Sequence, residues 1–235
     1  MNDGPIAIVT GAGSGIGRET AILLAHAGYA VALVGRTEAK LVETQSRIGG
    51  EDCLVISADL CNAGSADWIV ERTMSRFGRV DALCNVAGDA SLMPIEQVTP
   101  EAWRRCIDTN LSCIVHLTAK LLPVMCEQER GVIVNVSSMA SIDPFPGLAI
   151  YAAAKAGLNM FTQCTAREGA AHGIRAVCVA PGAVETPMLR GMFDKAMIPS
   201  EKTLDPRDVA TVIRDCVIGG RHFEMGETIL VKSQA

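Results

Sequence analysis

The chain has 235 residues, of which 49% are hydrophobic and 20% are charged, and its formal net charge at pH 7 is −5. This length and apolar content are sufficient for one α/β domain with a full hydrophobic core. The negative charge argues against a nucleic acid as the main partner, because no basic stripe is present to neutralise phosphate groups.

The cysteines, the histidines and the hydropathy of the chain bear on its cellular compartment, on metal binding and on membrane association. The nine cysteines are scattered singly, without a CxxC motif, which favours a reducing cytoplasm over a disulfide framework. The four histidines lie far apart in the sequence, so we expect no metal site. No apolar run reaches the roughly 18 residues of a membrane span, and no signal peptide precedes the first apolar segment. We therefore expect a cytoplasmic protein without a membrane partner.

Strand-like and helical segments alternate from the first residues onward. In chain order they are strand 5–10, helix 15–28, strand 30–34, helix 38–48, strand 53–57, helix 63–77, strand 82–86, helix 100–128, strand 132–136, helix 150–170, strand 175–179, helix 205–217 and strand 227–231. Nearly continuous apolar strands between helices indicate a parallel sheet that is covered on both faces. The sequence predicts one doubly wound α/β domain over residues 1–235, with a mostly parallel sheet.

A glycine-rich turn, TGAGSGIG, follows the first strand and opens the first helix. Glycines allow a tight turn and a close approach of the backbone to a pyrophosphate at the positive end of the helix. The position inside a strand–helix–strand unit is the context that confirms such a motif. The turn predicts a Rossmann-type dinucleotide site formed by Gly11, Gly13, Ser14, Gly15, Ile16 and Gly17.

The end of the second strand carries Gly35 and Arg36, where an acidic residue would bind the ribose of NAD. A guanidinium at this corner suits a 2′-phosphate, and Gly35 leaves no carboxylate to repel it. We therefore predict NADP as the cofactor. NAD remains the alternative, with Glu38 accepting the ribose hydroxyls.

Two further strand ends are candidates for the cofactor site. Asp59 and Leu60 follow the third strand, where a short polar side chain can meet the adenine edge. The fourth strand ends in Asn85-Val-Ala-Gly88, whose small residues allow a cofactor to pass over the sheet. We assign Asp59, Leu60, Asn85, Ala87 and Gly88 to cofactor binding.

The candidate for proton transfer is Tyr151, which precedes Lys155 by four residues on a predicted helix. Side chains at this spacing lie on one helical face. A phenol loses its proton near pH ~10, and a nearby cation favours the phenolate, so we expect Lys155 to lower the pKa of Tyr151. A serine at the end of the preceding strand, Ser138, is placed to polarise the same substrate oxygen.

Together these motifs resemble those of the short-chain dehydrogenase/reductase family, and the resemblance covers nearly the whole chain. The matching elements are the glycine-rich turn, an NNAG-like element at 85–88, a catalytic serine at Ser138, YxxxK at Tyr151 and Lys155, a catalytic asparagine at Asn110, and a PG element with a downstream threonine at 181–186. All of them occur in order and at family spacing.

The resemblance implies a hydride transfer between a nicotinamide and a carbonyl or secondary alcohol. Tyr151 would be the general acid–base, Lys155 would hold the nicotinamide ribose, Ser138 would bind the reacting oxygen, and Asn110 would help to hold a water linked to Lys155. The resemblance also implies that the nicotinamide end is framed by Pro181, Gly182, Val184 and Thr186.

Three departures from the family pattern bear on how the family's roles apply to this chain. Val86 replaces the second asparagine of NNAG, which we expect to be tolerated, and Ala154 stands where serine is frequent. The segment 227–235 lacks the Asp-Gly-Gly ending of tetrameric members, which puts the usual C-terminal subunit contact in question. The apolar helices at 100–128 and 150–170 correspond to those that pair subunits in relatives, so we expect a homodimer or homotetramer.

The substrate is expected to contact residues 187–203, the position of the family's variable lid. Met139, Phe145, Met188, Met192 and Phe193 are the assigned substrate residues, with Leu189, Met197 and Ile198 as further candidates. An apolar small-molecule carbonyl compound is the preferred substrate, although Arg190 and Lys195 leave an acidic one open. Two other possibilities also remain: a segment 187–203 that packs on the core without touching substrate, and a cofactor-sensing protein without turnover.

Overall fold

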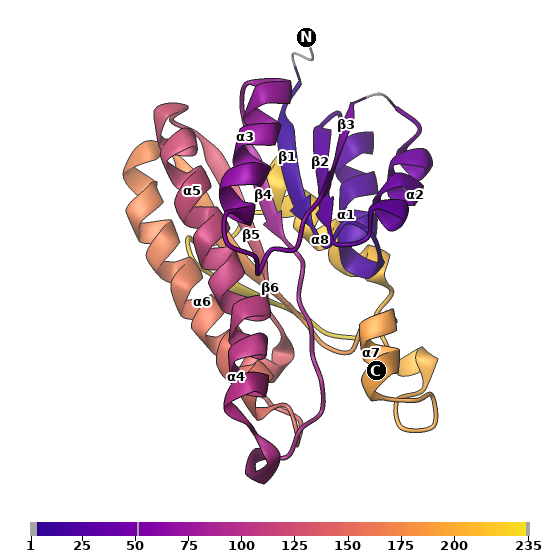
Figure 1. The fold of residues 1–235 in the computed structure, drawn as a ribbon. Coiled ribbons are helices and arrows are strands. Elements are labelled where there is room, and N and C mark those ends of the chain that lie inside the picture. The colour runs from indigo at the N-terminus through magenta and orange to yellow at the C-terminus, as the bar shows by residue number, and fades with distance from the viewer. Residues whose placement is uncertain (1–3, 51, 234–235) are drawn as a thin grey trace.

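The computed structural model describes residues 4–50 and 52–233, so the last two residues of the segment 227–235 lie outside the described residues. Its centre is a seven-stranded sheet in the order β3-β2-β1-β4-β5-β6-β7 (Figure 1). Every strand pair is parallel. The strands are β1 Ile6–Thr10, β2 Ala30–Gly35, β3 Cys53–Ser57, β4 Ala82–Asn85, β5 Gly131–Val136, β6 Ile174–Pro181 and β7 Thr228–Val231.

Helices cover both faces of this sheet. They are α1 Gly15–His26, α2 Glu38–Ile48, α3 Ser65–Phe77, α4 Pro100–Ile107, α5 Cys113–Glu127, α6 Ala149–Gly169, α7 Pro187–Met192 and α8 Pro206–Ile218. The architecture is the doubly wound, Rossmann-type α/β fold that the alternating segments predicted.

Alternation along the strands explains why the core has two layers. In β1, Ala7 and Val9 belong to the cluster that includes Leu24 of α1 and Ile213 of α8. Ile8, between them, belongs to the cluster on the opposite face with residues of α3 and α5. Because both faces are covered, every residue of β1 is buried.

The order in which the chain adds strands to the sheet reverses between β1 and β4, although both strands run parallel. This reversal positions the site. The chain runs outward from β1 to β3 on one side and from β4 to β7 on the other. Ligands of open α/β sheets bind in the crevice beyond the carboxyl ends of the strands at such a point. The glycine-rich turn after β1 and the loop after β4 both lie there.

The helix predicted at 100–128 is interrupted by a π-helical segment, Asp108–Ser112. Its start agrees with the sequence, because the Thr99 side chain accepts a hydrogen bond from the Ala102 N–H at 3.2 Å. Asn110, in the π segment, is 0% exposed. A single π turn within an α-helix often marks a functional site, and periodicity alone did not indicate it.

The stretch Pro100–Glu127 also corrects the expectation that no segment has the length and apolarity of a membrane span. It has 28 residues and a mean hydropathy of 1.2 in its most apolar window, and 39% of that window is buried inside the protein. A core helix passes the same test, and α5 packs on α3 and α6 here. Length and composition are weak grounds for a membrane span.

Candidate active site

Two cavities lie side by side at the carboxyl edge of the sheet and share Gly88 in their walls. The larger one, about 440 Å³, is lined by the turn after β1 and the ends of β2 and β3; we call it the glycine-turn cavity. The other, about 260 Å³, is lined by Ser138, Tyr151 and Lys155 and by parts of the segment 187–203; we call it the tyrosine cavity. The two cavities together form a crevice, and each could hold one part of an extended ligand.

The glycine-rich turn fits a group that needs a close backbone approach. Gly11 has a φ of +68°, and a Cβ on it would lie 3.0 Å from the Cα and N of Ala87. A Cβ on Gly17 would lie 2.3 Å from the backbone oxygen of Gly11. Side chains at these positions would fill the cradle at the N-terminus of α1, where a phosphate would lie.

The loop after β4 is fastened to this turn by Thr10. Its hydroxyl accepts hydrogen bonds from the N–H groups of Val86, at 3.0 Å, and Ala87, at 3.1 Å. Val86 also packs on the core, which explains how a valine is accommodated in the NNAG-like element. The floor of the crevice is therefore held by contacts within the chain.

Asn85 has a different place from the one assigned to it. Its side chain donates to the Asn135 amide oxygen at 2.8 Å, and Asn135 donates to Thr162 at 2.8 Å. Asn85 is 1% exposed and lines neither cavity. The residue joins β4 to β5 and α6 through buried side-chain hydrogen bonds.

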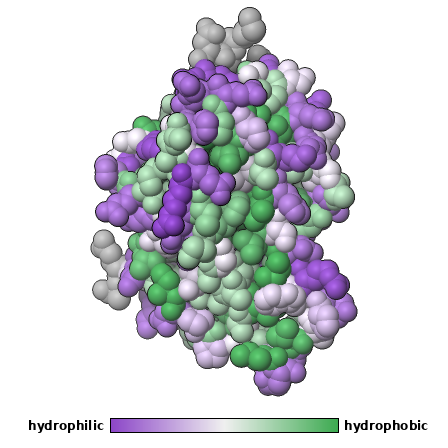
Figure 2. All heavy atoms as spheres, turned by 90° about the vertical axis from the view of Figure 1, so that its left-hand side faces the viewer, coloured by the Kyte–Doolittle hydropathy of each residue, from purple (hydrophilic) through white to green (hydrophobic). Residues whose placement is uncertain are grey.

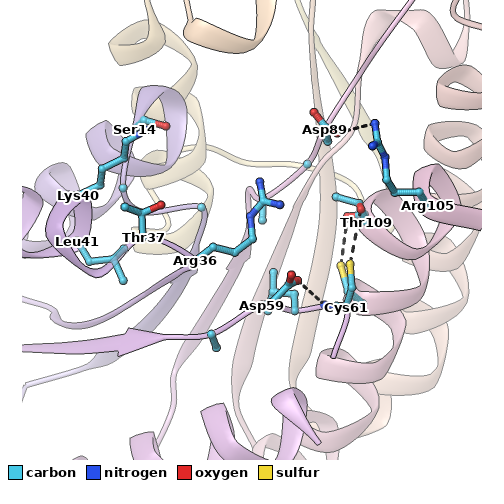
Figure 3. Close-up of a pocket in the computed structure, with 18 residues that line it drawn as sticks. Ser14, Arg36, Thr37, Lys40, Leu41, Asp59, Cys61, Asp89, Arg105 and Thr109 are labelled. Carbon is cyan, nitrogen blue, oxygen red and sulfur yellow. Dashed lines mark hydrogen bonds and ion pairs between the residues drawn. The ribbon is translucent and has the colours of Figure 1, made fainter. Parts of the chain in front are cut away.

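The ribose end of the glycine-turn cavity contains cations. Figure 3 shows the Arg36 side chain pointing into the cavity, with Thr37 and Lys40 on the neighbouring wall. The Arg36 guanidinium makes no hydrogen bond or ion pair with the residues that the structure describes. Arg18, by contrast, is held by Glu43 at 2.8 Å. The positive charge of Arg36 is therefore available to a ligand.

Tyr151, Lys155 and Ser138 converge on the tyrosine cavity. Tyr151 lies in the first turn of α6, and the Lys155 Nζ is 5.7 Å from the centre of its ring. Lys155 is 3% exposed and donates to the Val136 carbonyl at 2.9 Å. The Ser138 oxygen accepts a hydrogen bond from the Ala140 N–H at 3.1 Å.

The pKa values of this group differ from the expectation. Burial raises the pKa of Tyr151 to about 12, with a smaller raising effect from Asp89, while a hydrogen bond with Ser138 acts in the opposite direction. Burial also lowers the pKa of Lys155 to about 8. The predicted lowering of the Tyr151 pKa by Lys155 is not found, because burial, the largest influence on this phenol, raises its pKa. The phenol is protonated at neutral pH.

Asn110 connects the π segment to the mouth of the crevice. Its amide nitrogen donates to the Asp89 carbonyl at 2.8 Å, and its amide oxygen accepts from the Asp89 N–H at 3.2 Å. A Cβ on Gly88 would lie 2.9 Å from the Asn110 oxygen and 3.5 Å from the Lys155 Nζ. Asn110 and Lys155 therefore flank the same glycine, although Asn110 lines neither cavity.

The segment 187–203 covers the tyrosine cavity through α7 and the turn after it. Phe193, which is 4% exposed, meets Phe145 edge to face with ring centres 5.1 Å apart. All five residues assigned to the substrate line the cavity, and so do Leu189 and Ile198. Met197 does not, since it is 60% exposed outside the wall.

Arg190 faces the segment itself and not the cavity. It donates to Glu185 at 2.7 Å and to the Ile198 carbonyl at 2.8 Å. The hydrogen bond from Arg190 lowers the pKa of Glu185 to about 2. Neither Arg190 nor Lys195 lines the tyrosine cavity, which removes the two cations that left an acidic substrate open.

Most of the remaining assigned residues line a cavity. Gly11, Gly13, Ser14, Arg36, Asp59, Leu60 and Ala87 line the first, and Ile16, Pro181, Gly182, Val184 and Thr186 the second. Gly15 and Gly17 shape the turn without lining it. Sequence reasoning missed Lys40, Asp89 and Asp143, which also line cavities at this edge. Only Asp89, directly after the NNAG-like element, had a motif beside it.

Comparisons with known proteins agree with this geometry. Residues 5–196 match the short chain dehydrogenase family. An uncharacterized oxidoreductase of Staphylococcus saprophyticus is 35% identical over 208 residues, 87% of each chain. A 3-oxoacyl-[acyl-carrier-protein] reductase of Synechocystis is 34% identical over 215 residues, 89% of this chain and 87% of the relative.

A solved structure extends the likeness to the whole chain. The 3-ketoacyl-(acyl-carrier-protein) reductase of Brucella melitensis, complexed with NADH, superposes with a TM-score of 0.92 at 31% identity and covers 100% of this chain and 99% of its own. By its matched residues and its fold, the chain belongs to the short chain dehydrogenase family and is an oxidoreductase that acts on an alcohol or a carbonyl group.

Proposed function

We propose that the protein is an NADP-dependent carbonyl reductase in which Tyr151 supplies the proton. The observation that carries the proposal is the pair of joined cavities: one has a phosphate cradle and a free Arg36, and the other has Tyr151, Ser138 and Lys155 on one wall. A nicotinamide dinucleotide spans two such compartments, and when bound it supplies the hydride chemistry. Residues 187–203 would form the lid over the substrate.

The residues of this chain would act as follows. Tyr151 donates its proton to the substrate oxygen while Ser138 donates a hydrogen bond to the same atom. Lys155 holds the nicotinamide ribose hydroxyls, and Pro181 to Thr186 frame the nicotinamide end. Asn110, which shares Gly88 with Lys155, helps to hold a water next to the ammonium.

The protonated phenol suits the reductive reaction, in which Tyr151 is the proton donor. Burial keeps Tyr151 protonated at neutral pH.

The preference for NADP rests on Arg36 and on the absence of a carboxylate at Gly35. A charge-assisted contact with the 2′-phosphate is worth about 1.5–3 kcal/mol, or about 10- to 100-fold in affinity. Lys40, on the same wall, would add a second positive charge. NAD is the competing cofactor, and it gains support from the NADH in the similar Brucella structure.

Two measurements test the proposal. Titration by nicotinamide fluorescence should show tighter binding of NADPH than of NADH, and Arg36→Ala should remove that difference; tighter binding of NADH would reverse the cofactor assignment. Tyr151→Phe should bind NADPH normally and lose turnover of ketones by orders of magnitude. Near-normal turnover would remove Tyr151 from the mechanism.

Acyl thioesters, steroids and sugars remain in competition as substrates, and a cofactor-sensing protein without turnover is the second candidate function. All four members of the Asn110, Ser138, Tyr151 and Lys155 set are present, which favours the enzyme. NADPH consumption against a panel of ketones, aldehydes and acyl-thioester analogues separates these candidates.

We also propose a homodimer or homotetramer. Figure 2 shows the side of the molecule that carries α4, α5 and α6, where hydrophobic and weakly polar surface runs between polar margins. Trp103 is 45% exposed and Met160 is 58% exposed, and the exposed Ala153 and Ala156 keep the face of α6 flat enough for a second helix. A monomer by light scattering at micromolar concentration would contradict this.

The nine free thiols support a reducing, cytoplasmic location.

A further inference from the structure

The part of the tyrosine cavity away from Tyr151 is mostly apolar. Its walls carry methionine, leucine, isoleucine and phenylalanine side chains from the 139–148 loop and from the segment 187–203. Among the residues that the structure describes, two charged residues line the cavity, Lys155 and Asp143. Lys155 is buried and bonded to the Val136 carbonyl at 2.9 Å, and the proposed function commits it to the ribose. Asp143 is therefore the one charge left to face a substrate.

Asp143 is held in place by its backbone while its side chain is free. Its N–H donates to the Met139 carbonyl at 2.9 Å, which closes the short 3-10 turn Met139–Ser141. Its carboxylate has no hydrogen bond or ion pair within residues 4–50 and 52–233. Two positions along, Phe145 packs against Phe193 of the opposite wall. The loop thus places an unpaired anion at the exposed rim of an apolar cavity.

No cation of the lid balances this anion. Arg190, the cation of α7, is bound by Glu185 and by the Ile198 carbonyl. Lys195 and Lys202 are exposed and do not line the cavity. The free charge that a substrate tail meets is therefore negative, and the tail of a carboxylate substrate would be repelled there.

We propose that Asp143 is a specificity residue that binds a protonated amine at the far end of an apolar ketone whose carbonyl lies at Tyr151. Amino ketones, reduced to amino alcohols, are thus the preferred substrate class, and ketones with a carboxylate tail are disfavoured. The inference rests on the proposed function, since that function places the carbonyl end. Because Asp143 is exposed, solvent screening limits an ammonium–carboxylate contact there to about 5-fold in affinity at most.

The experiment uses three ketones of equal chain length that end in an ammonium, a methyl or a carboxylate group. Their binding to the enzyme saturated with NADP⁺ is measured by calorimetry, and their turnover with NADPH is measured separately. We expect the ammonium ketone to bind several-fold, up to about 5-fold, more tightly than the methyl ketone and the carboxylate ketone to bind least. Asp143→Asn should bring the three affinities together, whereas Glu71→Gln, which removes an exposed carboxylate of α3 away from the cavity wall, should keep the order.

The binding measurement tests the role of Asp143, and the turnover measurement tests the proposed reaction. Equal binding of the three ketones, preference for the carboxylate, or an order that survives in Asp143→Asn would overturn the role of Asp143, whatever the turnover. Preferential binding of the ammonium ketone without turnover of any ketone would support the role of Asp143 and overturn the proposed carbonyl reduction alone.

Discussion

Replacing Lys155 with methionine should stabilise the cofactor-free protein at neutral pH while it destroys the proposed site. Lys155 is 3% exposed, and its ammonium has one hydrogen bond, to the Val136 carbonyl, among the described residues. No carboxylate pairs with it there. Burial consequently lowers the pKa of Lys155 from 10.5 to about 8, which means that the folded protein holds this charge at a cost.

The magnitude follows from the pKa difference. Each pH unit between 10.5 and about 8 corresponds to about 1.36 kcal/mol, so the charged form costs about 3 kcal/mol. Loss of the hydrogen bond to Val136 offsets about 1 kcal/mol. Lys155→Met should therefore raise the free energy of unfolding by about 2 kcal/mol at pH 7, because a methionine of similar length fills the space.

The sign of the pH dependence is a further check. Below pH 8 both the folded and the unfolded protein hold the proton, and the full cost is present. Between pH 8 and 10.5 the unfolded protein binds more protons than the folded one, so wild-type stability rises with pH through this component. Above pH 10.5 the cost is gone. The advantage of Lys155→Met should thus shrink steadily from pH 8 to pH 10.

The assay is urea unfolding followed by circular dichroism, without cofactor, at pH 7, 8, 9 and 10. Taking the difference between variant and wild type cancels the titration of other groups. Lys202→Met, which replaces an exposed lysine, is the matched control and should change the unfolding free energy little at any pH. A destabilised Lys155→Met at pH 7, or a difference that stays constant with pH, would refute the reasoning.

Three other changes test separate parts of the structure. Gly17→Ala should weaken NADPH binding at least 10-fold by fluorescence titration, because its Cβ would lie 2.3 Å from a backbone oxygen of the cofactor turn; Gly50→Ala, with open space around it, is the control, and equal affinities would contradict the cradle. Glu185→Gln should raise the KM for an apolar ketone more than the Kd for NADPH, because it weakens the ion pair with Arg190 that stabilises the segment 187–203. An unchanged KM would show that this ion pair does not contribute to substrate binding. Asn135→Leu should lower the unfolding free energy by about 1–3 kcal/mol in urea, since it leaves the buried Asn85 amide without its partner; a neutral result would count against the amide network.

Local patterns were enough to predict the order of the elements and the place of the cofactor turn. Apolar runs separated by helical segments correspond to a parallel sheet because strands covered on both faces need apolar residues throughout. The glycine turn could be located because its requirement is local, as Gly11 with its positive φ shows. The spacing of Tyr151 and Lys155 was likewise sufficient to place both on one face of α6.

Contacts between distant segments decided the rest. Asn85 was assigned to the cofactor, but its partner across the sheet, Asn135, is 50 residues away. Arg190 was a candidate for substrate binding until Glu185 and Ile198 were seen to hold it. Partners of this kind depend on how loops meet in space, and a single sequence does not record them.

The contributions of sequence and tertiary structure are separated most clearly at the phenol of Tyr151. The residue types and their spacing predicted Tyr151 and Lys155 as a proton-transfer pair, and a nearby cation alone would lower the pKa of a phenol. The tertiary structure buries both groups, and the loss of water raises the pKa of Tyr151 and lowers that of Lys155. Sequence determined which groups meet, and only the packing around them decided the direction in which each pKa moves.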